Sequence, residues 1–265
     1  MKTILTSLSP LCLLTALPAL AHDTWLQTNN AIVRSGDAVY VDFVLGNHGN
    51  DHRDFKIAGK PSLDGSAIVV VGPDGSSIDL KPEFTDRGYA PKEGFWTARF
   101  EPMKPGLYLV AQTSDQVASY APERVVRSAK TFFLVTEHLD RVMASAPGYD
   151  RVLGHPLELV PEANTIAPMG PGVAIQVRLL FHGHPLSGEK VSFIPMGETL
   201  SAGFDSRFER KTDAAGRASF EPKEANYYLL VAHHLVPEKG VKFDRINYTA
   251  TLTVIVPALC PCCGE

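Results

Sequence analysis

Short runs in which apolar and polar residues alternate occur along most of the chain. Residues 38–44, 67–71, 95–100 and 107–111 follow this pattern and are rich in valine, isoleucine and aromatic residues. Turn-forming phrases, such as GPDG at 72–75, separate the runs. Alternating β-branched and aromatic residues between turn signals are typical of β-strands. The pattern predicts an all-β protein, and the 21 glycines and 20 prolines agree with it because helix interiors tolerate neither residue well.

A second series of similar runs begins after a long connection. Residues 136–170 lie between the two series and contain several prolines and glycines and one asparagine, so we place a domain boundary near Asp150. Short strands at this spacing, with turns between them, favour antiparallel sandwiches. We predict two immunoglobulin-like or prealbumin-like β-sandwich domains, at residues 22–150 and 151–257, followed by a cysteine-rich tail at 258–265. The second series comprises residues 173–181, 190–194, 217–220, 227–232 and 248–256.

The first residues of the chain have a different character. Lys2 precedes an apolar stretch that closes on Ala19-Leu20-Ala21, and a basic start, an apolar middle and small residues at the end form a secretory signal peptide. The stretch contains two prolines and is shorter than the roughly 20 apolar residues of a membrane span. We predict that residues 1–21 are a cleaved signal peptide, that the mature chain begins at His22, and that the protein is periplasmic. We expect no transmembrane segment in the mature chain.

Charge and cysteine usage narrow the picture. The chain has a formal net charge of −4, and its basic residues are not clustered. Proteins that bind nucleic acid present a basic face, so we exclude nucleic acid as a partner. Apart from Cys12 in the signal peptide, every cysteine lies at the C-terminus, at Cys260, Cys262 and Cys263. We therefore expect no disulfide within either predicted domain. Each domain must be stabilised by its hydrophobic core.

Six phrases spread over the chain carry a family resemblance. With them the chain resembles the DUF4198 family, exported bacterial proteins of unassigned function that are grouped with periplasmic components of nickel and cobalt uptake systems. The resemblance implies a transition metal ion as ligand and an inner- or outer-membrane metal transporter as partner. The cysteine-rich tail and His182 depart from the family pattern. The phrases are HDTWL at 22–26, GNH at 46–48, SAK at 128–130, LGHPLELVP at 153–161, HGHPLSG at 182–188 and TDAAG at 212–216.

A free N-terminal histidine is the first candidate for chemistry. Its α-amine and ring Nδ1 together chelate one metal, an arrangement called a histidine brace, and leave a position for another imidazole. Amine and imidazole nitrogens suit copper, nickel and zinc. Trp25 and Leu26 follow closely and begin an apolar strand that ties the end down. We interpret His22 as a metal ligand, and the alternative is a frayed terminus left by processing.

His48 and His52 are the candidates for the next ligand. Both lie in a segment rich in glycine and asparagine, residues 46–52, with Asp51 between them. Loops held by a rigid sheet often carry binding residues, and such a loop brings both rings toward one point. The alternative is that both are solvated loop histidines.

Two adjacent histidines, His233 and His234, end a predicted strand. Neighbours on a strand point to opposite faces, so only one of them faces a given site. If Tyr228, Leu230 and Ala232 face inward, His234 continues that inner row. We therefore take His234 as the candidate ligand and expect His233, a weaker candidate, to face out. The alternative is one packed and one exposed histidine without a metal.

Two further groups are weaker candidates. His182 and His184 are separated by Gly183, and in an extended strand both rings lie on one side and grip a metal. The alternative is a turn that needs Gly183 and Pro185 for its geometry. At the C-terminus, the thiolates of Cys260, Cys262 and Cys263 are soft ligands, whereas an oxidising compartment favours disulfides instead.

The sequence contains no nucleophile elbow, no phosphate-binding glycine loop and no helical zinc motif. We therefore expect a binding protein rather than an enzyme. Together with the resemblance, this predicts a periplasmic protein that binds nickel, cobalt or copper and assists metal uptake or delivery. Two alternatives stay open: a copper-dependent oxygenase that works from the same N-terminal brace, and a metal-free sandwich module that binds glycan or protein.

Overall fold

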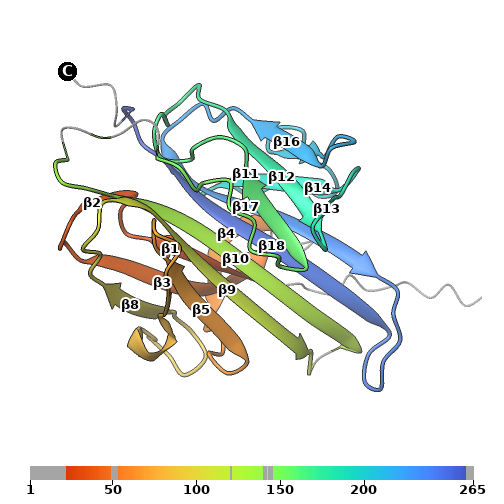
Figure 1. The fold of residues 1–265 in the computed structure, drawn as a ribbon. Helices are drawn as coiled ribbons and strands as arrows, with labels where there is room; N and C mark the ends of the chain where they lie inside the picture. The colour runs from red at the N-terminus through yellow and green to blue at the C-terminus, as the bar shows by residue number, and fades with distance from the viewer. Residues whose placement is uncertain (1–21, 49–52, 120, 140–141, 143–145, 261–265) are drawn as a thin grey trace, which may run out of the picture.

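The structure is a computed structural model that describes residues 22–48, 53–119, 121–139, 142 and 146–260, with only the backbone of residues 47, 48, 53–56 and 58. The chain folds into packed, largely antiparallel β-sheets, as the alternating pattern predicts (Figure 1). Among the described residues, no helix is long and apolar enough to cross a membrane.

A nine-stranded sheet is shared by the two halves of the chain. Its centre is a parallel pair, in which residues 123–131 of β10 align with residues 245–253 of β18. Because one of these strands belongs to each half, the halves are joined edge to edge within one sheet (Figure 1). In order, the sheet contains β15 (Glu209–Lys211), β14 (Lys190–Pro195), β17 (Asn226–Val236), β18 (Arg245–Val256), β10 (Glu123–Thr136), β9 (Gly106–Val117), β5 (Ser66–Val71) and β6 (Ser77–Asp79), with β2 (Ile32–Arg34) also paired to β10.

The N-terminal layer is a five-stranded sheet that covers one face of the shared sheet. Its core combines Leu26 and Phe43 with Phe133 of β10. A short 3-10 helix, η1 (Lys81–Glu83), precedes its edge strand. The layer contains β1 (His22–Thr28), β3 (Val39–His48), β8 (Trp96–Phe100) and β7 (Phe84–Asp86) in order, with β4 (Arg53–Gly59) paired to β3.

The C-terminal layer covers the opposite face. Phe132 and Leu134 of β10 belong to its core, whereas their neighbours Phe133 and Val135 belong to the N-terminal core. Successive residues of a strand face opposite ways, so β10 is buried on both faces, which explains its nearly continuous apolar run at 131–135. The layer contains β11 (Leu157–Pro161), β12 (Ile175–Phe181), β13 (His184–Pro185) and β16 (Arg217–Phe220).

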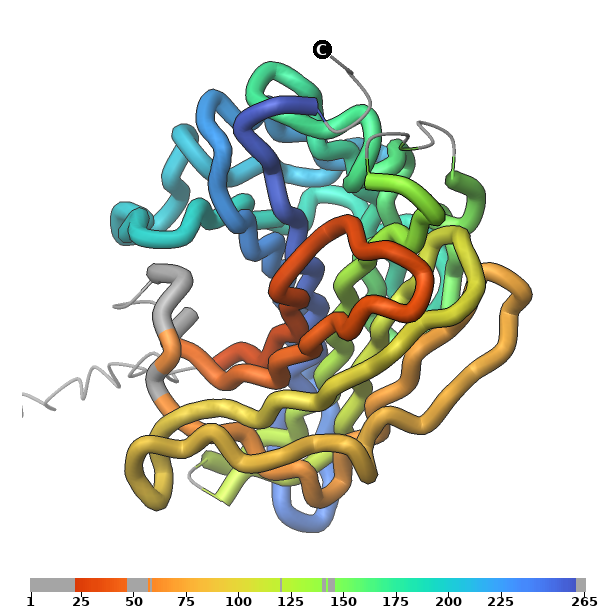
Figure 2. The backbone as a smooth tube through the Cα atoms, turned by 90° about the vertical axis from the view of Figure 1, so that its left-hand side faces the viewer, coloured from red at the N-terminus to blue at the C-terminus, as the bar shows by residue number. Residues whose placement is uncertain are grey.

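The first strand, β1, is buried between the two halves. Leu26 faces the N-terminal core, whereas Trp25 belongs to a third cluster with Ile194, Leu229 and Val231 of the C-terminal half. Figure 2 shows this strand, in red, between the N-terminal strands and the later part of the chain. The start of β1 is therefore held by both halves at once.

Two of the family phrases meet in a buried ion pair. Lys130 on β10 donates to the carboxylate of Glu158 on β11, and their side chains are 2% and 1% exposed. The backbone N–H groups of Leu153, Gly154 and His155 also donate to this carboxylate, at 2.7, 3.0 and 3.1 Å. Burial lowers the pKa of Lys130, although the charge of Glu158 opposes this. The phrases at 128–130 and 153–161 thus fix the connection between the two halves.

Candidate metal centre

The β1–β3 pairing places the predicted N-terminal ligand beside the next candidate. His22 aligns with Asn47 in an antiparallel register that continues to Thr28 opposite Val41. His48 follows Asn47 and pairs with Arg53 at the base of the β3–β4 hairpin. The backbones of His22 and His48 therefore lie at the same end of one sheet. His52 falls in the segment 49–52, outside the described residues.

The ring of His22 contains an atom without a partner. Its Nδ1 is buried and accepts or donates no hydrogen bond among the described residues. An unsatisfied buried polar atom costs about 1–3 kcal/mol, so native structures contain few of them. Nδ1 is also the ring nitrogen that chelates a metal together with the α-amine of an N-terminal histidine. The local geometry therefore fits a metal ligand at His22.

The residue after His22 is anchored by a histidine from far along the chain. Asp23 is fully buried, and its Oδ2 lies 3.0 Å from Nε2 of His233 on β17. Burial alone favours the neutral imidazole, but the charge and hydrogen bond of Asp23 outweigh it and raise the pKa of His233, against a smaller opposing effect of Lys190. The expectation that His233 faces out is wrong, because its face of β17 packs on β1 together with Leu229 and Val231.

His234 points to the opposite face of β17, as strand alternation predicts. Its Nδ1 lies 2.7 Å from Oε1 of Glu189, and its ring packs on Phe181 with a centroid separation of 4.6 Å. This face also carries Tyr228 and Leu230, both in the C-terminal core. The structure therefore brings His233 rather than His234 toward the His22 end of β1.

His182 and His184 flank a tight turn instead of forming one face of a strand. Phe181 pairs with His184 across it, and the two central residues, His182 and Gly183, have φ of 48° and 80°. Positive φ at both centres is the type I′ geometry that suits hairpins. The extended arrangement that would place both rings on one side is therefore not formed, and both side chains are exposed.

The remaining candidates add no ligand cluster. Cys260 is half-buried just beyond β18, while Cys262 and Cys263 lie outside the described residues. Within the described part of the chain, no three His, Cys, Asp or Glu side chains converge on one point. The described side chains alone therefore do not supply a full set of ligands for a metal at His22.

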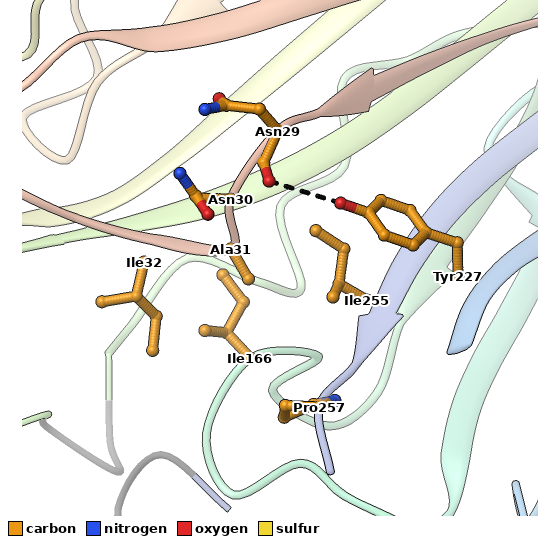
Figure 3. Close-up of a pocket in the computed structure, with 8 residues that line it drawn as sticks. All are labelled: Asn29, Asn30, Ala31, Ile32, Ile166, Tyr227, Ile255 and Pro257. Atoms are coloured by element: carbon orange, nitrogen blue, oxygen red, sulfur yellow. Dashed lines mark hydrogen bonds between the residues drawn. The ribbon is translucent and has the colours of Figure 1, made fainter. Parts of the chain in front are cut away.

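A separate pocket opens at the far end of β1. It has a volume of about 270 Å³ and lies between the β1–β2 turn, the loop at Ile166 and the ends of β17 and β18 (Figure 3). The hydroxyl of Tyr227 donates to the backbone oxygen of Asn29 at 3.3 Å and closes one side. Its walls are carboxamide and aliphatic groups, so it offers no charged group to a metal. Four distant segments build it, which is why sequence patterns did not reveal it.

The fold and the site define a β-sandwich protein whose first strand begins with a histidine. The profile of the family described as Domain of unknown function (DUF4198) matches residues 19–236, and the chain belongs to this family. No curated protein matches the chain.

Several solved structures are similar over much of the chain, at low sequence identity. The D0-D1 domain of intimin is 14% identical, with 89% of this chain and 100% of that chain covered and a TM-score of 0.26. Salmonella alpha-2-macroglobulin reacted with methylamine is 13% identical over 90% of this chain, with a TM-score of 0.26, and the match spans 15% of its length. A DUF4785 family protein from Legionella pneumophila is 14% identical, with 78% and 52% covered and a TM-score of 0.29.

Proposed function

We propose that this protein is an exported, periplasmic binding protein for a transition metal, with nickel, cobalt or copper as its cargo, and that it assists metal uptake or delivery together with a membrane transporter. The observation that carries the proposal is the register of β1 with β3, which aligns His22 with Asn47 and so brings the backbones of His22 and His48 to the same end of the sheet. The buried, unpartnered Nδ1 of His22 supports it.

Removal of residues 1–21 gives this strand end its chemistry. Cleavage after Ala21 turns the backbone nitrogen of His22 into a primary amine, which binds a metal in a chelate with Nδ1. His48 or His52 then supplies the next imidazole. The metal displaces the proton of an amine that titrates near about 7.7–8.0, so affinity falls as the medium becomes acidic. A carrier must release its metal, and acidification or transfer to a stronger ligand would do this.

The direct test compares two N-termini. Mature protein beginning at His22 is titrated calorimetrically with Cu(II), Ni(II) and Co(II), beside the same protein with one alanine added before His22. The addition removes the free amine from His22 and keeps every ring, so we expect a loss of at least about tenfold in affinity, or 1.4 kcal/mol. His184→Ala, on an exposed turn, serves as the matched control and should bind like wild type.

Two results oppose the proposal. Mature protein that stays metal-free after equilibration with all three ions has no such site. If the two proteins bind the metal with equal affinity, the α-amine of His22 is not a ligand and the histidine brace does not form. N-terminal mass analysis of protein exported with its own leader tests the processing step, for which we expect His22 as the first residue.

A further inference from the structure

Asp23 is an unusual residue for its position. It lies in the buried start of β1, immediately after the proposed ligand His22, and its side chain is fully buried. Burial of a carboxylate is costly unless a charged or hydrogen-bonding partner compensates for it. Here the partner is His233, 210 positions away, at 3.0 Å. The chain thus joins its first strand to its penultimate one, β17, at this point.

Two further residues of β1 have anchors of their own. The backbone oxygen of Thr24 accepts a hydrogen bond from Oγ1 of Thr251 on β18 at 2.8 Å, and Trp25 packs in the cluster with Leu229 and Val231. These contacts lie progressively farther from His22. Asp23 therefore makes the tertiary side-chain contact adjacent to the proposed metal ligand.

Strand alternation separates the roles of the two histidines. Side chains of His22 and Asp23 point to opposite faces of β1, so His233 meets the face that His22 does not use. His233 thus acts on the strand rather than on the ring of His22. Its ring is 29% exposed, with Lys190 close enough to influence its charge, so this contact is at the rim of the molecule rather than deep in a core.

We propose that Asp23 and His233 are positioning residues that fix the first residues of β1 and thereby preorganise the α-amine and ring of His22 for metal binding. The inference rests on the proposed function. A chelate gains affinity when its two donors are already held in the bound geometry, because less conformational freedom is lost on binding. Partners that hydrogen-bond directly to a metal ligand change metal affinity by about 10–100-fold when removed, and because Asp23 and His233 act through the neighbouring backbone we expect an effect near the lower end of that range.

The test uses three variants of mature protein starting at His22. His233→Leu removes the imidazole that contacts Oδ2 of Asp23, whereas His233→Gln retains a side-chain N–H that reaches this oxygen. His234→Leu is the matched control, because it removes the neighbouring histidine and its contact with Glu189 on the opposite face of β17. Amide hydrogen exchange of β1 is measured without metal, and Cu(II) affinity and the electron paramagnetic resonance spectrum are measured with it.

We expect His233→Leu to speed exchange at Asp23 and Thr24, to weaken Cu(II) binding by about tenfold and to give a spectrum with more than one Cu(II) component. We expect His233→Gln to restore all three readouts toward wild type, and His234→Leu to leave them unchanged. If His233→Leu fails to fold, the double variant Asp23→Asn with His233→Gln is used in its place. This variant keeps a neutral hydrogen bond between the two positions, and we expect its β1 amides to exchange faster than those of wild type.

Unchanged exchange in His233→Leu overturns the proposal, and so does faster exchange with unchanged Cu(II) affinity and spectrum. A wild-type protein that binds no metal refutes the proposed function and, with it, the role in metal binding. The exchange measurement then still decides whether the pair fixes β1, so the two failures are distinguishable.

Discussion

Two of the ion pairs between the halves of this protein, Lys130 with Glu158 and His233 with Asp23, differ in how completely they are enclosed. Lys130 and Glu158 are almost inaccessible, and the carboxylate accepts from the amine and from three backbone N–H groups. Asp23 is equally buried, but the ring of His233 is 29% exposed. The first pair has the properties of a permanent connection, whereas the second lies at the strand end where we place the metal.

The comparison shows that burial alone does not identify a functional charge. Glu158 has a partner on each oxygen, so the pair is already complete and offers nothing to a ligand. At the other pair, the neighbouring His22 retains a buried Nδ1 with no hydrogen-bond partner among the described residues. A buried Nδ1 without a hydrogen-bond partner among the described residues also occurs at His155, beside the enclosed pair. What distinguishes the His22 end is therefore its position on the β1–β3 ladder, where His22 aligns with Asn47.

The largest expected effect is at the enclosed pair. Lys130→Met leaves the Glu158 carboxylate buried without its counter-charge, and such a break costs about 3–5 kcal/mol of the free energy of unfolding. Urea denaturation of wild type and variant measures it. The double variant Lys130→Met with Glu158→Leu removes both charges and should recover a large part of the loss. A single variant as stable as wild type would contradict the structural role of this pair.

His155, which lies beside this pair, makes the free energy of unfolding depend on pH. Burial, followed by the positive charge of Lys130, lowers the pKa of His155 from its ordinary 6.5 to about 4. Between these values the unfolded chain binds a proton that the folded chain does not, so stability falls as pH decreases from 6.5 toward 4. Above pH 6.5 both states are neutral and the effect vanishes. Thermal unfolding across this range measures it, and His155→Asn should flatten the curve.

The strands were predictable from sequence, but their sharing of one sheet was not. Alternation located most strands, because the period of two reports a buried face locally. The parallel contact of β10 with β18 joins residues more than a hundred positions apart, and no local pattern encodes it. Lys130 within an apolar run looks like an exposed position until Glu158 is placed beside it. The predicted boundary near Asp150 stays a prediction.

The candidate site was predictable in part. The N-terminal HDTWL phrase indicated His22, and the β1–β3 register brings its backbone beside that of His48. Choosing between His233 and His234 required knowing what covers each face of β17. The C-terminal core covers one face, but β1 covers the other, so the residue expected to face solvent instead meets Asp23. A charged residue two positions before the apolar pair Trp25-Leu26 was the signal that a partner existed.

The smallest expected effect sharpens the comparison at β1. Thr251→Val keeps the shape of the buried side chain but removes its 2.8 Å hydrogen bond to the backbone oxygen of Thr24. Loss of one such bond costs about 1 kcal/mol, well below the effect of breaking the enclosed pair. Differential scanning calorimetry of the metal-free protein measures it. Since Thr251 anchors β1 one residue beyond Asp23, this variant should change Cu(II) affinity less than His233→Leu does. An equal or greater loss would mean that the whole strand, rather than the Asp23 contact, sets the geometry at His22.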